Sequence, residues 1–346
     1  MKKTIDIPKK MHALVLHEVG KLTYDEVANY ELKKDTVLVK MKYCGICSSD
    51  IERVFVNGTY HFPTIPGHEM AGEIVVTNSE DKDLIGKNVT IFPMLPCMKC
   101  DACKKEEYAQ CSNYNYFGSR CDGGFAEYLL VPKWNLVFTD DLDLKIACLA
   151  EPAAVSLHAV NILKIKKGEK IAISGTGTIA FLIAYFAKYQ GANVTIVGRN
   201  SNKLKKASEF GFNTLNVNDI DECKNTFDSV VEAVGSNDSI NQAIELVNTF
   251  GKVVLVGNPK GDVLLNKVNY WKILRKQLDV TGSWNSSYGH DVNDWHAVIK
   301  YMKNGKIPFE KLITREYSLK ESNKAFNYLM NKNTQKFKVV FKIDEN

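Results

Sequence analysis

The chain has 346 residues, 45% of them hydrophobic, which indicates about two domains with enough apolar side chains for a buried core in each. A disordered or fibrous protein is therefore excluded. Lys and Arg number 45 and Asp and Glu number 40, so the net charge is only +5, and no run of five or more like charges occurs. Nucleic acid is not an expected partner.

The N-terminal segment carries charges but no apolar run behind them, which argues against a secretory signal and makes the cytoplasm the expected location. Residues 171–187 contain no charged side chain, whereas a membrane span needs about 20 predominantly apolar residues. Gly, Ser and Thr interrupt this stretch at 174–178, which favours a strand, a turn and a helix over a membrane span.

Short β-rich segments, such as 13–16 and 37–41, occupy the first 150 residues, separated by turn residues and long irregular stretches. From about residue 170, short apolar runs alternate with helix-like segments, which predicts a parallel sheet with crossover helices. These runs are 170–173, 193–197, 228–231 and 252–256. The alternation stops after Gly282, where residues 284–290 are rich in Ser, Asn and Gly, and residues 336–341 have the pattern of one more strand.

The α/β segment therefore interrupts a mainly β domain. We predict a protein of the α/β class with two domains. Residues 1–157 and 283–346 would form the β-rich domain, and residues 158–282 a doubly wound parallel sheet of the Rossmann type.

Four cysteines lie in one short segment with the spacing Cys97-x-x-Cys100-x-x-Cys103-x7-Cys111. A gap of two residues lets successive thiolates turn toward one ion, and four sulfur ligands complete the tetrahedron of zinc. Since no coordination position stays open for a substrate, the pattern predicts a structural zinc site. An odd total of nine cysteines, in a chain without an apparent export signal, argues against a disulfide framework.

A second set of metal-binding residue types is dispersed along the chain: Cys47, the pair His68-Glu69, and Glu151. Taken singly, Cys47 has the alternative of a small core residue, and His68 that of a buried, hydrogen-bonded histidine. Spacing alone does not assemble these residues into one site.

A glycine-rich loop, Gly175-x-Gly177-x-x-Ala180, directly follows a predicted strand and opens a helix-like segment. Gly175 permits the tight turn, Gly177 lets the backbone approach a pyrophosphate, and Ala180 lets helix and strand pack closely. The pyrophosphate would lie at the helix N-terminus, where Thr178 and Ile179 join the predicted contacts. The loop predicts dinucleotide binding, and a purely structural turn is the alternative.

The next predicted strand ends at Gly198-Arg199-Asn200, where an NAD-binding chain normally carries an acidic residue for the ribose 2′-hydroxyl. The absent carboxylate removes the repulsion that would exclude a 2′-phosphate, and Arg199 with Asn200 could bind that group. NADP is therefore predicted over NAD. The alternative is that Arg199 is a solvated turn residue.

These motifs occur together, and in this order, in the zinc-dependent medium-chain dehydrogenases, which the chain resembles over essentially its whole length. The resemblance implies a GroES-like catalytic domain for the β-rich part. The pair Glu151-Pro152 is similar to the polyol and threonine dehydrogenase branch. Residues 117–128, 272–276 and 281–284 are similar to the branch that oxidises galactitol 1-phosphate.

The resemblance implies that Cys47, His68 and Glu151 hold a catalytic zinc, with Glu69 beside them as an exchangeable ligand or close carboxylate. Together with the four-cysteine site, this gives two zinc ions per chain. The implied reaction is hydride transfer between a secondary hydroxyl of a polyol and a nicotinamide cofactor.

The segment after Cys47 is expected to assist that reaction. Asp50 resembles the carboxylate that orients the imidazole of His68. Ser49 matches the hydroxyl residue that begins the family's proton relay, whereas Glu52 stands where many relatives have a relay histidine. The resemblance therefore leaves the route of the proton beyond Ser49 open.

A phosphorylated polyol such as galactitol 1-phosphate, which would give tagatose 6-phosphate, requires cations near the substrate. Arg53 and Arg120 are candidates for its phosphate, and Trp284 is a further candidate for substrate contact. Each arginine has the alternative of a solvated or carboxylate-paired side chain. Sorbitol, butanediol and threonine dehydrogenases of the same family are the alternative activities.

A non-enzymatic alternative is a zinc- and nucleotide-binding redox sensor that acts through Cys44, Cys47 and Cys121. The joint presence of Cys47, His68 and Glu151 favours the enzyme. Because relatives pair the edge strands of their cofactor domains, the resemblance also implies a homodimer or homotetramer.

Overall fold

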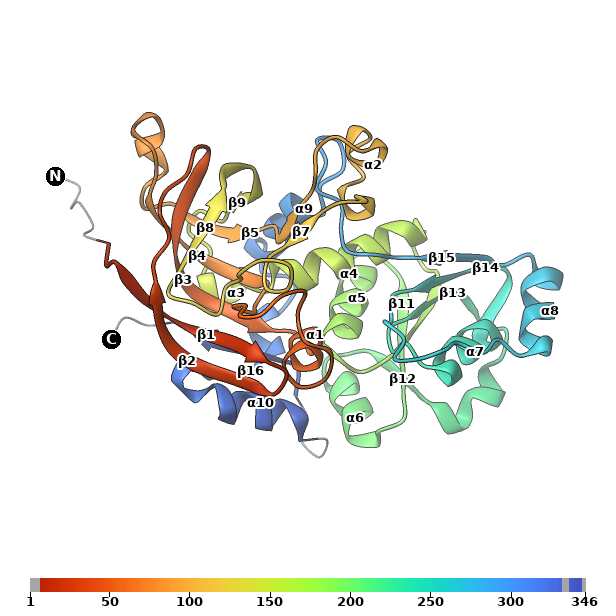
Figure 1. Cartoon of the computed structure of the whole chain (residues 1–346). Coiled ribbons are helices and arrows are strands. Elements are labelled where there is room, and N and C mark those ends of the chain that lie inside the picture. Colours follow the sequence, from red (N-terminus) through yellow and green to blue (C-terminus); the bar gives the residue numbers. More distant parts are fainter. Residues whose placement is uncertain (1–6, 332–335, 344–346) are drawn as a thin grey trace. The chain divides into compact units, whose positions relative to one another are not determined.

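A computed structural model describes residues 7–331 and 336–343, which form two compact units (Figure 1). The first unit consists of the described parts of Met1–Glu151 and Ser287–Asn346. The second unit is Pro152–Ser286, so it interrupts the first unit in the sequence.

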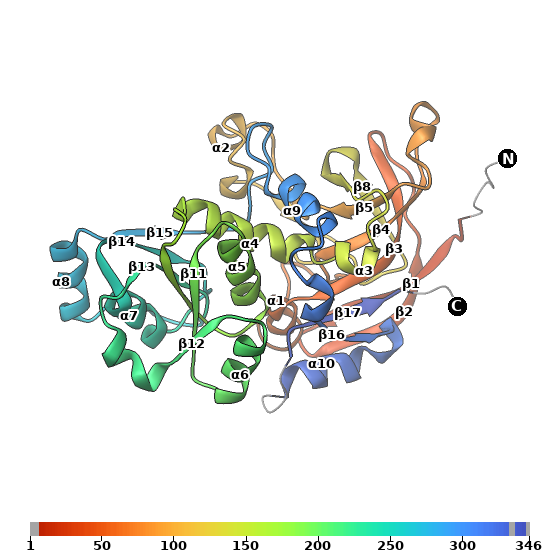
Figure 2. The ribbon, with the colours of Figure 1, turned by 180° about the vertical axis from the view of Figure 1, so that it is seen from behind.

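The first unit is built mainly of β-strands. They are β1 (Lys10–Glu18), β2 (Lys21–Ala28), β3 (Thr36–Ile46), β4 (Glu69–Val76), β5 (Asn88–Ile91), β6 (Met94–Leu95), β7 (Asn115–Tyr116), β8 (Tyr128–Pro132), β9 (Leu136–Phe138), β16 (Ile313–Tyr317) and β17 (Lys338–Lys342). Seven of them form one sheet, in the order β16-β17-β3-β4-β5-β9, with β8 also paired to β3. β17, the last strand of the described residues, pairs antiparallel with β3 from the first part of the chain; both strands are labelled in Figure 2, which shows the ribbon from behind.

β3 is the central strand of this sheet, because it pairs with β17, β4 and β8. Its apolar side chains Val37, Val39 and Met41 are fully buried, which fixes the position of the segment that follows the strand. The helices of the first unit are short at its N-terminal end and longer near its C-terminal end. They are α1 (Ser48–Glu52), α2 (Asp101–Lys104), α3 (Leu144–Ala147), α9 (Asp294–Lys303) and α10 (Ser322–Met330).

The second unit alternates strands and helices after α4 (Ala150–Leu163), which begins at the end of the first unit. Its elements are β10 (Lys170–Ser174), α5 (Thr178–Tyr189), β11 (Asn193–Gly198), α6 (Ser201–Glu209), β12 (Asn213–Asn216), β13 (Phe227–Glu232), α7 (Asn237–Leu246), β14 (Val247–Leu255), α8 (Lys267–Lys276) and β15 (Asp279–Gly282). All six strands are parallel, in the order β12-β11-β10-β13-β14-β15. This is the strand order of a Rossmann sheet, which confirms the predicted fold class.

The uncharged stretch 171–187 divides as its glycines predict. It contains most of β10, the glycine-rich turn and most of α5. Among the described residues, no helix combines the length and the apolar character needed to cross a membrane. The last predicted strand, 336–341, differs in its limits, because β17 begins only at Lys338 and continues to Lys342.

Candidate active site

Three of the dispersed metal-binding residues meet where β3 ends and β4 begins. These strands are antiparallel neighbours and Gly45 pairs with Glu69, so Cys47, just after β3, lies opposite His68, just before β4. The potential ligand atoms of Cys47, His68 and Glu69 all lie within 4.8 Å of one another. His68 and Glu69 are buried and Cys47 is half-buried. A thiolate, an imidazole and a carboxylate at this separation form a donor set that suits zinc.

The two carboxylate oxygens of Glu69 have different environments. Its Oε1 accepts a hydrogen bond from Nζ of Lys338 at 2.5 Å, and this lysine, at the start of β17, is itself buried. Burial acts to lower the pKa of Lys338, but the Glu69 carboxylate outweighs it, so the pKa lies above its ordinary value. The other oxygen, Oε2, is buried without a hydrogen-bond partner. An orphaned carboxylate oxygen in this cluster fits a metal ligand.

Gly45 is the residue that leaves room for this carboxylate. A Cβ atom at Gly45 would lie 2.0 Å from Oε2 of Glu69. Neither Lys338 nor Gly45 was among the residues predicted for the site. A single lysine followed by the apolar run Val339–Phe341 was the available signal for Lys338.

Asp50 connects two of the candidate ligands. Its Oδ2 accepts a hydrogen bond from the backbone N–H of Cys47 at 2.9 Å, and its Oδ1 lies 3.3 Å from Nδ1 of His68. The contact with His68 is close but lacks the alignment of a directed hydrogen bond. Burial acts to raise the pKa of Asp50, yet His68 and Arg53 hold it below its usual value. The Asp50 carboxylate therefore faces Nδ1 of the imidazole and leaves Nε2 for a ligand.

Arg53 lies on the turn after α1, next to the cluster. Its Nη1 donates to Oγ of Ser49 at 2.9 Å and to Oδ1 of Asp50 at 3.3 Å. Only 23% of its side chain is exposed. The guanidinium that was predicted to bind a phosphate is therefore engaged with two residues of the site itself.

Glu151 lies in the first turn of α4, beside the cluster but outside the group of three whose ligand atoms converge. Its Oε1 accepts a hydrogen bond at 3.2 Å from the hydroxyl of Tyr116, a residue that the sequence did not single out. Burial raises the pKa of Glu151, and nearby His68 only partly opposes this effect. Glu151 is thus buried with one oxygen held by a neutral donor.

The four clustered cysteines also converge. Sγ of Cys100 lies 3.5 Å from that of Cys103 and 3.9 Å from that of Cys111, and the Cys97 and Cys103 sulfurs are 3.9 Å apart. A regular tetrahedron with zinc–sulfur bonds of about 2.3 Å has edges of about 3.8 Å. The backbone N–H of Cys103 is the main cause that lowers the pKa of Cys100 to about 6, which favours the thiolate needed by a metal. The spacing of these sulfurs therefore fits a four-sulfur zinc site.

In the second unit, the glycine-rich loop lies between β10 and α5. Gly175 has a φ of +123°, a conformation that other residues rarely adopt, and Gly177 is the N-cap of α5. A Cβ atom at Gly177 would meet nothing within 4 Å, so the backbone there is open to a ligand. Ala180 is buried, whereas Thr178 and Ile179 are half-buried at the start of the helix. The free N–H groups at this end of α5 suit a pyrophosphate.

The residues after β11 differ in what their side chains do. Arg199 is exposed. Asn200 is the N-cap of α6, and its Oδ1 accepts a hydrogen bond from the backbone N–H of Lys203 at 3.1 Å. Gly198 is required by close packing, because a Cβ there would lie 2.7 Å from Cγ2 of Thr176. The side chain of Asn200 thus caps a helix, which leaves Arg199 as the free polar group of the three.

Sequence reasoning also missed Glu232, at the carboxyl end of β13. This carboxylate is fully buried, and its Oε1 accepts hydrogen bonds from the backbone N–H groups of Val234 and Gly235, at 2.8 and 2.9 Å. β13 is the neighbour of β10 in the sheet, so Glu232 shapes the loop beside the glycine-rich turn. An acidic residue at the end of an apolar strand, three residues before a glycine, was the available signal.

The other predicted residues lie in varied surroundings. Glu52 is half-buried on α1. Arg120 is half-buried in a turn of the first unit, where it stacks on two tyrosines. Trp284, in the second unit, is 58% exposed.

Two of the three cysteines invoked for a redox sensor, Cys44 and Cys121, are poorly suited to that role. Cys44 is fully buried, and burial raises its pKa well above the usual value. Burial also raises the pKa of Cys121 to about 12. Since the thiolate is the reactive form of cysteine, both thiols are disfavoured as redox sensors.

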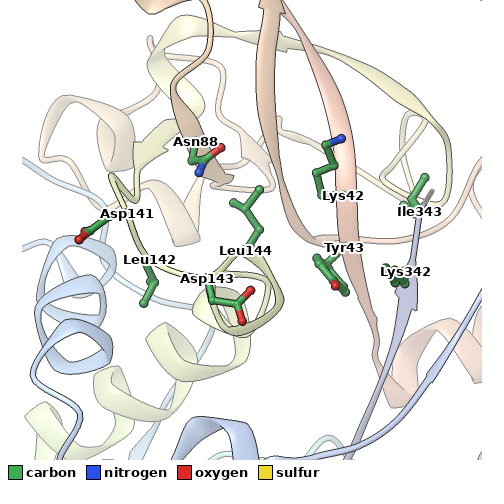
Figure 3. Close-up of a pocket in the computed structure, with 9 residues that line it drawn as sticks. All are labelled: Lys42, Tyr43, Asn88, Asp141, Leu142, Asp143, Leu144, Lys342 and Ile343. Atoms are coloured by element: carbon green, nitrogen blue, oxygen red, sulfur yellow. The ribbon is translucent and has the colours of Figure 1, made fainter. Parts of the chain in front are cut away.

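A surface pocket of about 430 Å³ also belongs to the first unit (Figure 3). Charged side chains of both signs line it, among them Lys42, Lys342, Asp141 and Asp143. None of the described residues that line this pocket is a predicted site residue, so it is separate from the candidate active site.

The chain matches two family models. Residues 33–141 match the alcohol dehydrogenase GroES-like domain, and residues 175–304 match the zinc-binding dehydrogenase model. The chain is 33% identical to galactitol 1-phosphate 5-dehydrogenase of Escherichia coli K12 over 305 residues, which are 84% of this chain and 88% of that protein. The chain therefore belongs to the family of zinc-binding alcohol and polyol dehydrogenases, and it is an oxidoreductase.

Solved structures agree with this assignment. The crystal structure of galactitol-1-phosphate dehydrogenase from Escherichia coli has a TM-score of 0.90 and 31% identity, and the match covers 96% of this chain and 100% of that one. The crystal structure of a zinc-binding dehydrogenase from Sinorhizobium meliloti bound to NADP has a TM-score of 0.89 and 28% identity, covering 97% and 100%.

Proposed function

We propose that this chain oxidises a secondary hydroxyl of a polyol phosphate, such as galactitol 1-phosphate, and transfers the hydride to a nicotinamide cofactor. The observation that carries the proposal is the buried convergence of Cys47, His68 and Glu69, in a chain related to galactitol 1-phosphate 5-dehydrogenase. Oxidation at carbon 5 of galactitol 1-phosphate gives tagatose 6-phosphate.

The proposal includes two zinc ions per chain. Cys47, His68 and Glu151 would hold the catalytic ion, with Glu69 as the exchangeable carboxylate, and the cluster of residues 97–111 would hold the structural ion. The orphaned oxygen of Glu69 and the sulfur spacing support these assignments. When bound, the catalytic ion supplies Lewis acidity, which lowers the pKa of a hydroxyl in contact with it.

The residues around the cluster orient the metal-binding side chains and transfer the proton of the substrate hydroxyl. Asp50 orients the imidazole of His68, and Lys338 holds one oxygen of Glu69. Oγ of Ser49 accepts an N–H of Arg53, so the Ser49 proton and a second lone pair are available to relay the substrate's proton to solvent.

The domain division belongs to the same proposal. Residues 1–157 and 283–346 would carry the catalytic chemistry, and residues 158–282 would bind the cofactor through the loop at Gly175 and Gly177. A compact division close to these limits supports it. We also propose a cytoplasmic location, because none of the nine cysteines, all of which lie among the described residues, forms a disulfide, as in a reducing compartment.

A homodimer or a homotetramer built from dimers is the proposed assembly. β15 is the last strand of its sheet, so one of its edges is unpaired by the described residues. On the adjoining α8, Val268, Trp271 and Leu274 expose 66%, 46% and 58% of their surface. An open strand edge beside exposed apolar side chains favours association with a second copy.

NADP is the proposed cofactor, and we expect a higher kcat/KM with NADP than with NAD. Arg199 is exposed where an acidic residue would otherwise bind the ribose, and the relative from Sinorhizobium meliloti is bound to NADP. Loss of a charged hydrogen bond costs about 1.5 to 3 kcal/mol, so Arg199→Ala should lower kcat/KM for NADP about 10- to 100-fold and leave NAD little changed. Lys206→Ala, on α6 after Arg199, is the control. A wild-type preference for NAD would contradict the proposal.

The substrate is tested by comparing a phosphate ester with its parent polyol and with other alcohols. Initial rates with galactitol 1-phosphate, galactitol, sorbitol, threonine and 2,3-butanediol should show the highest kcat/KM for the phosphate ester. The phosphate adds charged hydrogen bonds that galactitol lacks, which is the reason for this expectation. If only one unphosphorylated alcohol is turned over, the assignment as an oxidoreductase stands, and that alcohol replaces galactitol 1-phosphate as the substrate.

A further inference from the structure

The side chain of Arg120 is stacked between two aromatic rings. Its Cζ lies 4.0 Å from the ring centroid of Tyr60 and 4.4 Å from that of Tyr114, and its Nη2 donates to the hydroxyl of Tyr60 at 3.1 Å. Within the part of the chain that the structure describes, no carboxylate is paired with Arg120. Stacking holds the guanidinium plane and leaves donors on its edge for a ligand.

We call the group formed by Tyr60, Arg120 and Tyr114 the Arg120 clamp. Hydrogen bonds connect it to the candidate active site. The backbone N–H of Arg120 donates to the carbonyl of Tyr116 at 3.0 Å, and the hydroxyl of Tyr116 donates to Glu151 at 3.2 Å. The clamp is therefore one short turn away from a residue that contacts a proposed metal ligand.

Close backbone packing fixes the same turn against the loop that carries His68. Gly118 has a φ of +77°, and a Cβ atom there would lie 2.6 Å from the carbonyl oxygen of Gly67, the residue before His68. A second hydrogen bond, from the backbone N–H of Tyr60 to the carbonyl of Ser119 at 3.3 Å, joins the Tyr60 loop to the turn. The Arg120 clamp and the candidate metal ligands thus share one packed framework.

The two arginines predicted for a phosphate differ in what they can still bind. Arg53 has Nη1 committed to Ser49 and Asp50, and only 23% of its side chain is exposed. Among the described residues, the side chain of Arg120 has a single hydrogen bond, to a neutral hydroxyl that is itself accessible, since Tyr60 is 68% exposed. A planar fork with unpaired donors matches a phosphate monoester, and holding it in advance reduces the entropy lost on binding.

We propose that the Arg120 clamp is the subsite that recognises the phosphate of the substrate, whereas Arg53 positions Ser49. The proposal rests on the proposed function, because it assumes a phosphorylated polyol. Tyr60 and Tyr114 are specificity-determining residues in this view, since they hold the guanidinium plane. The ligand chemistry is a phosphate dianion, free or esterified.

The test compares a phosphate ester with its parent alcohol in three variants. We expect Arg120→Ala to lower kcat/KM for galactitol 1-phosphate about 10- to 100-fold, through KM, and to leave the galactitol values unchanged. Arg120→Lys keeps the charge without the planar fork and should recover only part of the loss. Tyr114→Ala, which removes one stacking ring, should give a smaller loss of the same kind.

Arg315→Ala is the matched control, because Arg315 is another arginine of the first unit stacked on a tyrosine, at 4.7 Å from the ring centroid of Tyr328. It should alter neither substrate's kinetics. Calorimetric titration of the zinc-loaded protein, without nicotinamide cofactor, with galactitol 1-phosphate and with inorganic phosphate gives a readout independent of turnover. Binding of both should weaken in Arg120→Ala and not in Arg315→Ala.

The outcomes separate this proposal from the proposed function. If the wild type prefers the phosphate ester and Arg120→Ala keeps that preference, the phosphate is bound elsewhere and the proposal is wrong. If the wild type shows no such preference, the proposed substrate is wrong. Inorganic phosphate that binds to the wild type and not to Arg120→Ala would still show that the Arg120 clamp is an anion subsite. If phosphate does not bind either, both the proposed substrate and the proposed subsite are wrong. Unchanged melting temperatures and galactitol turnover exclude misfolding as the cause of a loss.

Discussion

Cys47→Ala should lose turnover to background and bind one zinc ion per chain, where two are proposed for the wild type. Cys47 supplies the only thiol of the cluster that also contains His68 and Glu69, whereas the four-sulfur site is formed entirely by residues 97–111. A zinc site that loses a thiolate ligand loses much of its affinity, and the second site is unaffected. Zinc per chain, measured by mass spectrometry, and initial rates with the preferred polyol check this expectation.

Two further cysteine variants make the result specific. Cys44→Ala removes a fully buried thiol from the same strand, three residues before Cys47, and should keep both zinc ions and turnover. Cys103→Ser should instead release the other proposed ion and lower the melting temperature, because that ion would link the segment 97–111. Turnover retained by Cys47→Ala would remove this residue from the catalytic site.

The parts of the protein that were predictable from sequence are those whose residues lie close together in the chain. The four clustered cysteines span 15 residues, and their sulfurs lie 3.5 to 3.9 Å apart where measured, as a shared ion requires. The glycine-rich loop spans six residues between a strand and a helix, and the parallel sheet around it has the expected strand order. Local spacing carries this information because a turn or a helix start fixes the geometry by itself.

The surroundings of the candidate metal centre depend on tertiary pairing. The register that places Gly45 opposite Glu69 brings Cys47 and His68 together, and no spacing between them encodes it. Lys338 reaches the same place from 269 residues away through the pairing of β17 with β3. The family resemblance supplied Cys47 and His68, but a general likeness does not indicate a partner on a distant strand.

Some predicted ligand-binding side chains already have partners within the protein, which compete for their donors and acceptors. Arg53 is a candidate for a phosphate, with a solvated or carboxylate-paired side chain as the alternative, and here Ser49, four residues before it, accepts its N–H while Asp50 accepts another. Asn200 is predicted to contact the cofactor beside Arg199; an asparagine directly before a helix usually caps that helix, and its oxygen does so here. Both interactions are local, so helix geometry could have predicted them.

Lys338→Met should lower the free energy of unfolding by about 3 to 5 kcal/mol and turnover by about 10- to 100-fold. Nζ of Lys338 lies 2.5 Å from Oε1 of Glu69, and the two side chains are only 6% and 1% exposed. Removing the cation leaves a buried carboxylate without its counter-charge, which is the costly way to break such a pair. Turnover should fall because Glu69 is no longer held beside Cys47 and His68. Urea unfolding of the zinc-loaded protein and initial rates measure the two effects.

The double variant Glu69→Gln with Lys338→Met separates charge from packing. It leaves no charge buried at the pair, so it should recover most of the lost stability without recovering turnover. Lys338→Arg, which keeps the charge but needs more space, should lie between the wild type and Lys338→Met in stability. A Lys338→Met variant as stable as the wild type would show that the ion pair adds no stability. A double variant no more stable than Lys338→Met would show that the loss comes from packing around the lysine stem, because removing the orphaned charge would then have relieved nothing.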